Sequence, residues 1–507
     1  MKIFKSLILI ILFLSSCNQE LKKPNIIFIY TDDQRFDTVG VIGNNQVYTP
    51  NLDKLAFNGA VFSNTYNMGA WHGAICVASR AMMISGKSVW RAKEEINYWK
   101  KNDSITLSNT WPMILKRNGY KTYMTGKWHI EAPVEKVFDV VKNIRPGMPD
   151  DNRHIFAKKL IEWKEESGDL TELENFTPPG YGRPIDEKDQ SWSSYDTVFG
   201  GYWDGGKHWS EVLADDAIEF LKDANSQEDP FFMYLAFNAP HDPRQAPKKF
   251  IDLYPLSSIN LPKNYSTQHP YMNEIGNRPG LRDEALAPYP RSEYAVKKHI
   301  QEYYAVISHL DEQVGKIIDQ LENEKMLDNT YVIFTSDHGL AVGQHGLIGK
   351  QSLYDHSIRV PMIISGPEIE KGKKISHDIY LQDIVPTTLD LAGIEIPEKI
   401  DFKSFYSLIK GSKNKSLYDG IYGTFGCCQG NYIDYQRMIR KEGFKLMLFP
   451  KNKRMELYDL INDPYEMYNL ANKLEYKEKV KNLFKDLTFL QKEVGDTLNL
   501  KRIFTLQ

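Results

Sequence analysis

The chain has few cysteines and no strong excess of charge of either sign. Four of its 507 residues are cysteine, which is too few for a disulfide framework. The formal net charge is −3, whereas a nucleic-acid-binding protein carries a basic face. Beyond the N-terminal segment, no stretch is apolar enough to span a membrane. The sequence therefore excludes a disulfide-framed mini-protein, a general nucleic-acid binder and a multi-span membrane protein.

The composition is that of an ordinary globular protein. Hydrophobic residues make up 42% of the chain and charged residues 25%. A chain of this length can bury one large core and a second, smaller one. We therefore expect a large domain followed by a smaller subdomain.

Residues 1–16 have the pattern of an export signal. Lys2 and Lys5 precede the apolar run 7–14, which is too short to cross a bilayer. The string Leu-Ser-Ser-Cys that ends at Cys17 resembles a bacterial lipobox, in which that cysteine becomes the lipidated first residue. A plain cleaved signal is the alternative. We predict an exported protein that a lipid on Cys17 anchors to the membrane, in the periplasm or at the outer membrane.

Two other cysteines, Cys427 and Cys428, are adjacent in the sequence. In an exported protein such a pair forms a strained vicinal disulfide or stays as packed thiols. The sequence leaves both states open.

The fourth cysteine, Cys76, begins a helical pattern that runs to residue 85. A cysteine there lies near a helix N-terminus, where free N–H groups favour a developing anion. Arg80 is four residues further on and shares its helical face. Gly86 ends the pattern as a C′ glycine does. Without other evidence, a small buried thiol would be the simpler interpretation.

Acidic residues and histidines follow three apolar, strand-like runs. Asp32 and Asp33 follow residues 25–30, Asp337 and His338 follow residues 331–334, and His241 follows residues 231–237. Open α/β sheets bind ligands at such strand ends. Carboxylates there suit Ca²⁺ or Mg²⁺, whereas a thiolate beside them is a soft ligand in a hard site. The mismatch disappears if Cys76 presents oxygen instead of sulfur.

The string Cys-Val-Ala-Ser-Arg from Cys76 to Arg80, with Gly86 shortly after, resembles the C-x-[PA]-x-R signature of the type I sulfatases. Ala78 stands where many members carry proline, a known variant of the family. The resemblance implies that a maturation enzyme converts Cys76 to formylglycine, whose hydrated aldehyde is the nucleophile. Because the motifs occur in family order, the resemblance covers nearly the whole mature chain.

The resemblance also implies the fold and the domain organisation. Sulfatases have the alkaline-phosphatase-like α/β fold, in which helices sandwich a large mixed sheet and a small C-terminal subdomain carries an antiparallel sheet. We expect the catalytic domain to span residues 24–400 and the C-terminal subdomain residues 401–507.

By the same resemblance, one divalent cation is held by Asp32, Asp33, Asp337, His338 and the modified Cys76. Calcium is the expected ion and magnesium the alternative. His338 departs from the asparagine that is common at its position, and it softens the ligand set.

Five further residues are expected to act on the sulfate ester. Lys127 and His129 belong to the string Gly-Lys-Trp-His, which resembles the family's sulfate-binding lysine and diol-orienting histidine. Lys350, at the end of the glycine-rich loop 339–349, resembles the second sulfate-binding lysine. Arg80 and both lysines are expected to neutralise charge on the transferring SO₃ group. His241 is expected to protonate the leaving alcohol, and His129 to take a proton from the second hydroxyl.

Three loop-rich regions are candidates for substrate contacts. Residues 131–200 contain no motif and are interpreted as an insertion on the active-site side. Residues 203–209 are rich in aromatic and charged groups, which suit either a sugar contact or a helix cap. Residues 243–295 are rich in proline and are expected to form one wall of the cleft.

The sequence thus predicts a sulfuric ester hydrolase that acts on sulfated carbohydrate, such as ulvan, fucoidan or carrageenan. Host glycosaminoglycans and choline sulfate are alternative substrates. A phosphodiesterase or phosphonate monoester hydrolase of the same superfamily is the rival enzyme. A glycan-binding surface lipoprotein is the rival without catalysis.

Overall fold

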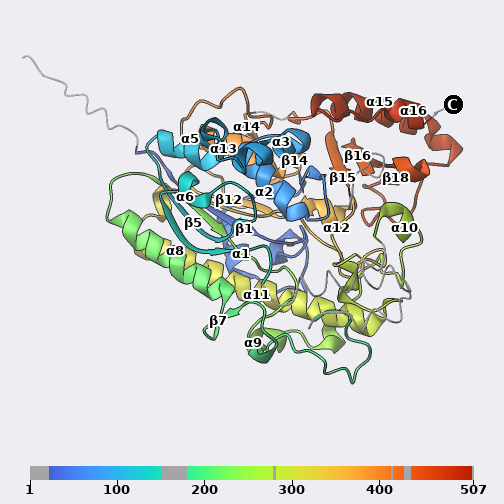
Figure 1. Cartoon of the computed structure of the whole chain (residues 1–507), viewed down its shortest axis with the longest axis horizontal. Coiled ribbons are helices and arrows are strands. Elements are labelled where there is room, and N and C mark those ends of the chain that lie inside the picture. Colours follow the sequence, from blue (N-terminus) through green and yellow to red (C-terminus); the bar gives the residue numbers. More distant parts are fainter. Residues whose placement is uncertain (1–21, 150–179, 278–280, 413–414, 427–435, 505–507) are drawn as a thin grey trace, which may run out of the picture.

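The computed structural model of the chain describes residues 22–149, 180–277, 281–412, 415–426 and 436–504 (Figure 1). The predicted signal, the lipobox Cys17 and the Cys427–Cys428 pair lie outside these residues. So does a large part of the predicted insertion 131–200. Within the described residues, no helix is both long and apolar enough to cross a membrane.

An eight-stranded mixed sheet forms the centre of the molecule. The order across the sheet is β13 (Lys373–Ile375), β2 (Gly59–Phe62), β12 (Met362–Ser365), β10 (Thr330–Ser336), β1 (Asn25–Thr31), β9 (Phe231–Ala236), β5 (Lys121–Lys127) and β6 (Val140–Arg145). From β10 to β6 the adjacent strands are parallel to one another, whereas β12 is antiparallel to both β10 and β2.

The sheet is buried on both faces, as continuous apolar strands require. Alternate residues of β1 enter two different cores: Phe28 packs in one, and Ile27 and Ile29 in the other. The first core is covered by α2 (Ile75–Ser85), α3 (Val89–Trp99), α5 (Trp111–Arg117) and α13 (Ile384–Leu391). The second is covered by α1 (Pro50–Phe57), α8 (Trp209–Asn225) and α11 (Glu293–Asn323), with α8 and α11 in contact (Figure 1). The expected sandwich of helices around a mixed sheet is confirmed.

A second sheet carries the C-terminal part of the chain. It is ordered β18 (Arg454–Asp459), β17 (Phe444–Phe449), β16 (Gln436–Lys441), β15 (Ile421–Phe425) and β4 (Gly69–Ala70). The first four strands are antiparallel, and α15 (Lys477–Glu493) packs its Leu and Phe side chains on them. The edge strand β4 comes from residues before Cys76, so the proposed domains 24–400 and 401–507 share a sheet. At Gly69, φ is +102° and a Cβ would lie 1.8 Å from the carbonyl oxygen of Thr424, so this junction requires glycine.

The remaining elements are short. The strands β3 (Thr65–Tyr66), β11 (Arg359–Val360) and β14 (Ile379–Tyr380) form a small sheet, and β7 (Trp203–Asp204) pairs with β8 (Lys207–His208). The short helices are α4 (Ser104–Ser108), α6 (Val134–Val137), α9 (Lys248–Ile251), α10 (Met272–Ile275), α12 (Asp355–Ile358), α14 (Tyr406–Ile409) and α16 (Leu500–Ile503).

The described part of the 131–200 region is built into the main fold. Its strand β6 extends the central sheet beside β5, and α6 precedes it. The interpretation of this part as an insertion was therefore wrong. The sequence concealed the strand because its side chains are only half-buried or exposed, and so show no apolar pattern.

Candidate active site

Helix α2 places Cys76 in its first turn. Ala74 is the N-cap and Gly86 ends the helix in the left-handed conformation, with φ of 65°. The Sγ of Cys76 lies 3.3 Å from Nδ1 of His129, and the cysteine side chain is buried. Its position matches the prediction of a thiol near free helical N–H groups.

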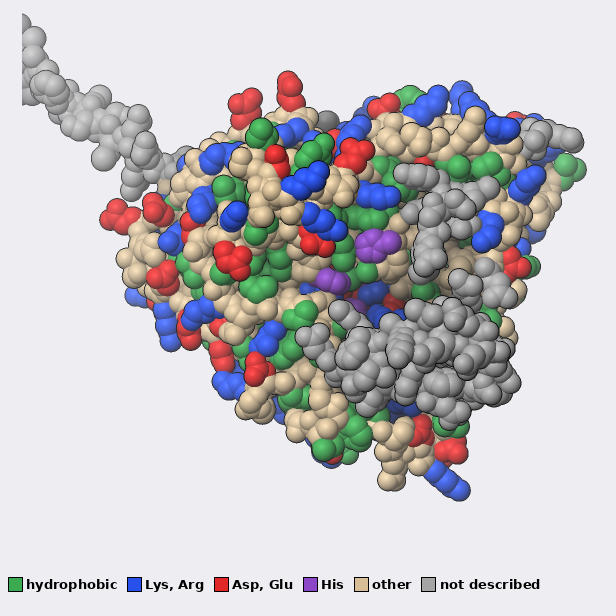
Figure 2. All heavy atoms as spheres, viewed as in Figure 1, with side chains coloured by type: hydrophobic (Ala, Val, Ile, Leu, Met, Phe, Trp, Pro, Cys, Tyr) green, Lys and Arg blue, Asp and Glu red, His purple; other side chains and the backbone are tan. Residues whose placement is uncertain are grey.

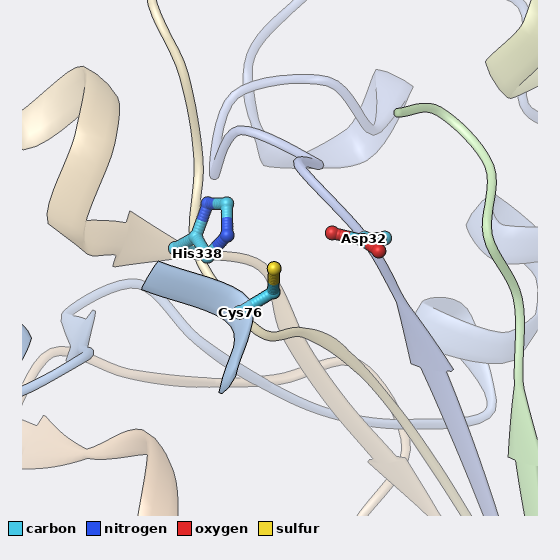
Figure 3. A group of neighbouring side chains, drawn as sticks. All are labelled: Asp32, Cys76 and His338. Carbon is cyan, nitrogen blue, oxygen red and sulfur yellow. The ribbon is translucent and has the colours of Figure 1, made fainter. Parts of the chain in front are cut away.

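The parallel pairing of β1 and β10 brings the two acidic strand ends together. Thr31 is in register with Ser336, so Asp32 and Asp33 leave one strand where Asp337 leaves the other. The backbone N–H of Asp33 donates to Oδ1 of Asp337 at 3.2 Å. Figure 3 shows Asp32 at the end of β1, with Cys76 and His338 facing the same space.

All five predicted metal ligands lie in one cluster. Ligand atoms of Asp32, Asp33, Asp337 and His338 approach one another within 4.8 Å, and those of Asp32, Cys76 and His338 do so as well. Within the described structure, Asp32 Oδ1, Asp337 Oδ2 and His338 Nε2 are buried without a hydrogen-bond partner. Nδ1 of His338 donates to the carbonyl oxygen of Gly339 at 2.9 Å, so Nε2 is the nitrogen that can bind a metal. Burial lowers the pKa of His338, but the charges of Asp337 and Asp33 raise it to about 9, so Nε2 would give up its proton when a cation binds. Carboxylate oxygens that lack a hydrogen bond, next to an imidazole nitrogen, fit a divalent cation.

Three buried cationic side chains surround these carboxylates. Arg80 Nη2 lies 3.2 Å from Asp337 Oδ2, and Lys127 Nζ contacts Asp32. Lys350 Nζ lies 2.8 Å from Asp33 Oδ1. Arg80 also contacts the backbone of Lys127, because its Nη1 donates to the carbonyl oxygen of Lys127 at 2.8 Å. The predicted sulfate-binding residues are thus assembled at the ligand cluster.

The charges shift the pKa values of several groups. Burial opposes the Cys76 thiolate, yet Lys127, His129 and Lys350 together hold the pKa of Cys76 well below its ordinary value. Burial raises the pKa of Asp33 to about 7, against the effect of Lys350. The shifts favour an anion at Cys76 and disfavour the charged form of Asp33.

His241 lies near Oδ2 of Asp33, whereas His338 lies near Oδ1. Its Nε2 is 3.7 Å from Asp33 Oδ2, and its Nδ1 is 2.8 Å from the carbonyl oxygen of Asp242. Burial and the charge of Lys350 lower the pKa of His241 to about 3, so the ring is neutral at pH 7 when no ligand is bound. Asp33, His241 and Asp242 also lie close enough together for a metal. However, Arg282 contacts both carboxylate oxygens of Asp242 and Tyr181 donates to one of them, so this second group leaves no oxygen of Asp242 for a cation.

His129 is held against Cys76 by an unusual backbone and a close neighbour. Its φ is 59°, which places a non-glycine residue in the left-handed region. A Cβ on Gly147 would lie 2.4 Å from the His129 ring, so the ring rests directly on that glycine. Figure 2 shows histidine side chains at a hollow near the middle of one face of the molecule.

The loop at residues 203–209 caps a helix. Nδ1 of His208 accepts the backbone N–H of Ser210 at 3.1 Å as the N-cap of α8, and the ring packs against His309. Of the two interpretations left open for this loop, the structure shows the cap. His208 is thereby engaged away from Cys76.

The sequence did not reveal a second layer of residues behind His241. Asp242 is paired with Arg282, and Tyr181 donates to the same carboxylate. Both partners come from loops with no motif. The only signal was the acidic residue directly after the histidine.

A buried anion-favouring residue, three cations and a carboxylate cluster at the strand ends of a mixed α/β sheet define a hydrolase of negatively charged esters. The sulfatase family model matches residues 24–394, and the model of the N-sulphoglucosamine sulphohydrolase C-terminal region matches residues 343–493. The chain belongs to the sulfatase family, and it is an enzyme that hydrolyses sulfate esters.

Named relatives support this assignment. An arylsulfatase of Clostridium perfringens is 30% identical over 480 residues, covering 92% of this chain and 94% of the relative. An ulvan-active sulfatase of Formosa agariphila is 27% identical, covering 94% and 82%. A solved structure in complex with its substrate D-glucosamine-2-N,6-O-disulfate has a TM-score of 0.69 at 23% identity, covering 94% of this chain and 99% of the other; it supports the alkaline-phosphatase-like fold.

Proposed function

We propose that this sulfatase removes sulfate from a sulfated carbohydrate, with a formylglycine made from Cys76 as its nucleophile. The observation that carries the proposal is the convergence of Arg80, Lys127 and Lys350 on the carboxylates beside Cys76. A sulfate monoester is an anion, and buried cations fixed in advance stabilise it most as its charge redistributes during transfer.

The proposed cation would be held by Asp32, Asp33, Asp337 and His338, beside residue 76. Calcium suits this set best because most of its donors are carboxylate oxygens. When bound, the ion would draw in a sulfate oxygen and lower the pKa of the hydroxyl that attacks sulfur. The orphaned oxygens of Asp32 and Asp337 support this assignment.

The conversion of Cys76 resolves the mismatch between a soft thiol and hard ligands. The converted side chain would present hydroxyl oxygens where Sγ now lies. His129 is placed to act on it, because its Nδ1 is 3.3 Å from that sulfur. His129 would accept a proton from the second hydroxyl and so complete the release of sulfate.

His241 is the proposed proton donor to the leaving sugar oxygen. The neutral ring of the ligand-free site must gain a proton for this role. A bound sulfate monoester adds negative charge beside the ring, which favours its protonation. The negative charges of Asp242 and Asp32 also raise the pKa of His241.

The carbohydrate class is proposed from the relatives and from the predicted export of the chain. The ulvan-active relative favours an algal polymer, with fucoidan and carrageenan as further candidates. We propose that the protein is lipid-anchored through Cys17 in the periplasm or at the outer membrane, where such fragments are available. The predicted maturation enzyme would act on Cys76 before this use.

A panel of esters tests the function. Purified protein is incubated with oligosaccharides of ulvan, fucoidan and carrageenan, with glucosamine 6-sulfate, choline sulfate and 4-nitrophenyl sulfate, and released sulfate is measured. A matched phosphate diester and a phosphonate monoester test the rival chemistry. Faster turnover of a sulfated sugar than of choline sulfate and both phosphorus esters is expected. Turnover of the phosphorus esters alone would overturn the proposal.

A further inference from the structure

Asp242 lies on the Nδ1 side of the His241 ring. The Nδ1 of His241 is 2.8 Å from the carbonyl oxygen of Asp242 and 3.3 Å from its Oδ1. Both oxygens can only accept, so Nδ1 carries a proton and donates it. The other ring nitrogen, Nε2, faces Asp33 Oδ2 at 3.7 Å and is therefore on the side of the reaction centre. The backbone carbonyl of Asp242 thus accepts the Nδ1–H hydrogen bond, and its carboxylate, with Tyr202 OH at 3.4 Å, borders the same nitrogen.

The carboxylate of Asp242 is itself fixed by two donors. Arg282 reaches both of its oxygens, with Nη1 at 2.5 Å from Oδ2 and Nη2 at 3.4 Å from Oδ1. The hydroxyl of Tyr181 donates to Oδ2 as well. A two-pronged guanidinium contact holds a carboxylate in one plane more firmly than a single bond does. The Asp242 side chain is 3% exposed, so water does not compete for these bonds.

The same arginine connects Asp242 to the loop of Lys350. Arg282 Nη2 pairs with Asp283, and Asp283 accepts a hydrogen bond from Gln351. The neighbouring Lys350 contacts Asp33 with its Nζ. The network therefore connects Asp242 with Gln351, the residue next to the proposed sulfate-binding Lys350.

We propose that Asp242, held by Arg282 and Tyr181, is a positioning residue that fixes the His241 ring for proton transfer to the leaving sugar oxygen. This inference rests on the proposed sulfatase function and deepens it. Asp242 does not touch the ester. Its carboxylate oxygen Oδ1 borders Nδ1 at 3.3 Å, beside the backbone carbonyl that accepts Nδ1–H, so that Nε2 keeps its direction toward the leaving group.

The proton-transfer step balances as follows. The attacking oxygen bonds to sulfur while the bond from sulfur to the sugar oxygen breaks, and that electron pair stays on the sugar oxygen. The sugar oxygen takes the proton from Nε2 of a ring that carried protons on both nitrogens. The ring keeps the Nδ1 proton and its bond to Asp242, and water returns the Nε2 proton before the next turnover.

The test compares two leaving groups in Asp242→Asn and Arg282→Lys. A 4-nitrophenolate leaves without needing a proton, whereas a sugar alkoxide needs one. For the sugar sulfate that the wild type hydrolyses fastest, Asp242→Asn should lower kcat about 100-fold, within the usual range for a proton donor. With 4-nitrophenyl sulfate, kcat should stay within about fivefold, because orientation of the donor no longer matters. Arg282→Lys should show the same selective loss to a smaller degree.

Asp496→Asn is a matched control. Asp496 is another buried carboxylate held by an arginine and a tyrosine, with Arg437 Nε at 2.9 Å and Tyr422 OH at 2.6 Å. It follows α15 in the C-terminal part, so its replacement should change neither the leaving-group preference nor KM.

The outcomes separate the two proposals. An equal loss of kcat on both substrates, in variants that melt like the wild type, would overturn the positioning role and leave the sulfatase function standing. The same selective loss in Asp496→Asn would also overturn it. If Asp242→Asn does not fold, Arg282→Lys decides by the same criterion. A wild type that releases sulfate from neither substrate overturns the proposed function and this inference with it.

Discussion

At the scale of single residues, removal of the Cys76 thiol should affect activity far more than stability. Its side chain is small and buried, so its removal should cost the fold only about 1 kcal/mol. We predict that Cys76→Ala lowers kcat about 10⁴-fold, because the nucleophile is lost while binding groups remain. Sulfate release and the melting temperature measure the two effects. Mass spectrometry of the wild-type peptide around residue 76 should show the mass loss that accompanies conversion of thiol to aldehyde.

Activity of Cys76→Ala near the wild-type level would contradict the formylglycine assignment. An unconverted thiol in active wild-type protein would do the same.

A second prediction at the scale of single residues concerns Gly147, which the His129 ring contacts. In Gly147→Ala the new methyl group would meet the His129 ring at 2.4 Å, so the ring must turn away from Cys76. We expect kcat on 4-nitrophenyl sulfate to fall about tenfold or more, since misplacement of a catalytic group by about 1 Å is this costly. Because both changes act through one ring, Gly147→Ala combined with His129→Ala should be no slower than His129→Ala alone. Additive losses would show that Gly147 acts elsewhere.

The residues that sequence could identify are those carried by short local strings. Asp32 with Asp33, Cys76 with Arg80, and Asp337 with His338 each follow or begin one element, so their spacing is visible along the chain. Arg282 and Tyr181 are 40 and 61 residues from Asp242, on loops that only the folded chain brings near. Gly147 likewise meets His129 through a turn outside any motif. Such contacts produce neither a motif nor a periodic pattern in the sequence, so they cannot be predicted from it.

At the scale of elements, β5 depends on one glycine at its carboxyl end. Gly126 has φ of +90°, and a Cβ there would lie 2.0 Å from the carbonyl oxygen of Ala236 on β9. Gly126→Ala should destabilise the protein by about 2–4 kcal/mol, since both the dihedral and the contact are unfavourable. It should also raise KM for sulfate esters, because the next residue is Lys127. Thermal melting and initial-rate kinetics measure the two changes.

Gly119→Ala is the control for this element. Gly119 also has a positive φ, but its Cβ would meet nothing within 4 Å. It should cost less stability and leave KM unchanged. Equal effects of the two substitutions would show that the strand tolerates a shift at Gly126.

The central elements of the sheet were predictable and its edge was not. The buried strands β1, β9 and β10 are continuous apolar runs. No residue of the edge strand β6 is buried, so its side chains are a mixture of polar and apolar. The contribution of β4 to the C-terminal sheet could not be predicted, because two residues carry no pattern.

At the scale of the whole molecule, the cation should stabilise the folded protein. Asp337 is 304 residues from Asp33 and meets Asp32 and Asp33 only after folding, so the ion binds the folded state and not the unfolded one. Calcium at 100 times its Kd should add about 2.7 kcal/mol to the free energy of unfolding. We predict that exhaustive chelation lowers both the melting temperature and the activity. Ca²⁺ should restore them better than Zn²⁺.

Asp337→Asn provides the control, because it should abolish the calcium-dependent shift in melting temperature. Unchanged stability and full activity after chelation, with no metal found by elemental analysis, would contradict the site.

The direction of β1 determines how far the entry point of the chain lies from the reaction centre, which matters for a polymeric substrate. The strand begins at Asn25, close to the predicted tether, and runs to the reaction centre, a span of about 23 Å for seven residues. Pro24 and Lys23 at its start are bonded to Tyr120 and Asn329, so the entry point of the chain is fixed. If Cys17 carries the predicted lipid, the anchor would join the fold at the start of β1, and the reaction centre would lie at the other end of that strand. A polymer would then reach Asp32 and Asp33 from the end of β1 that is away from the entry point of the chain.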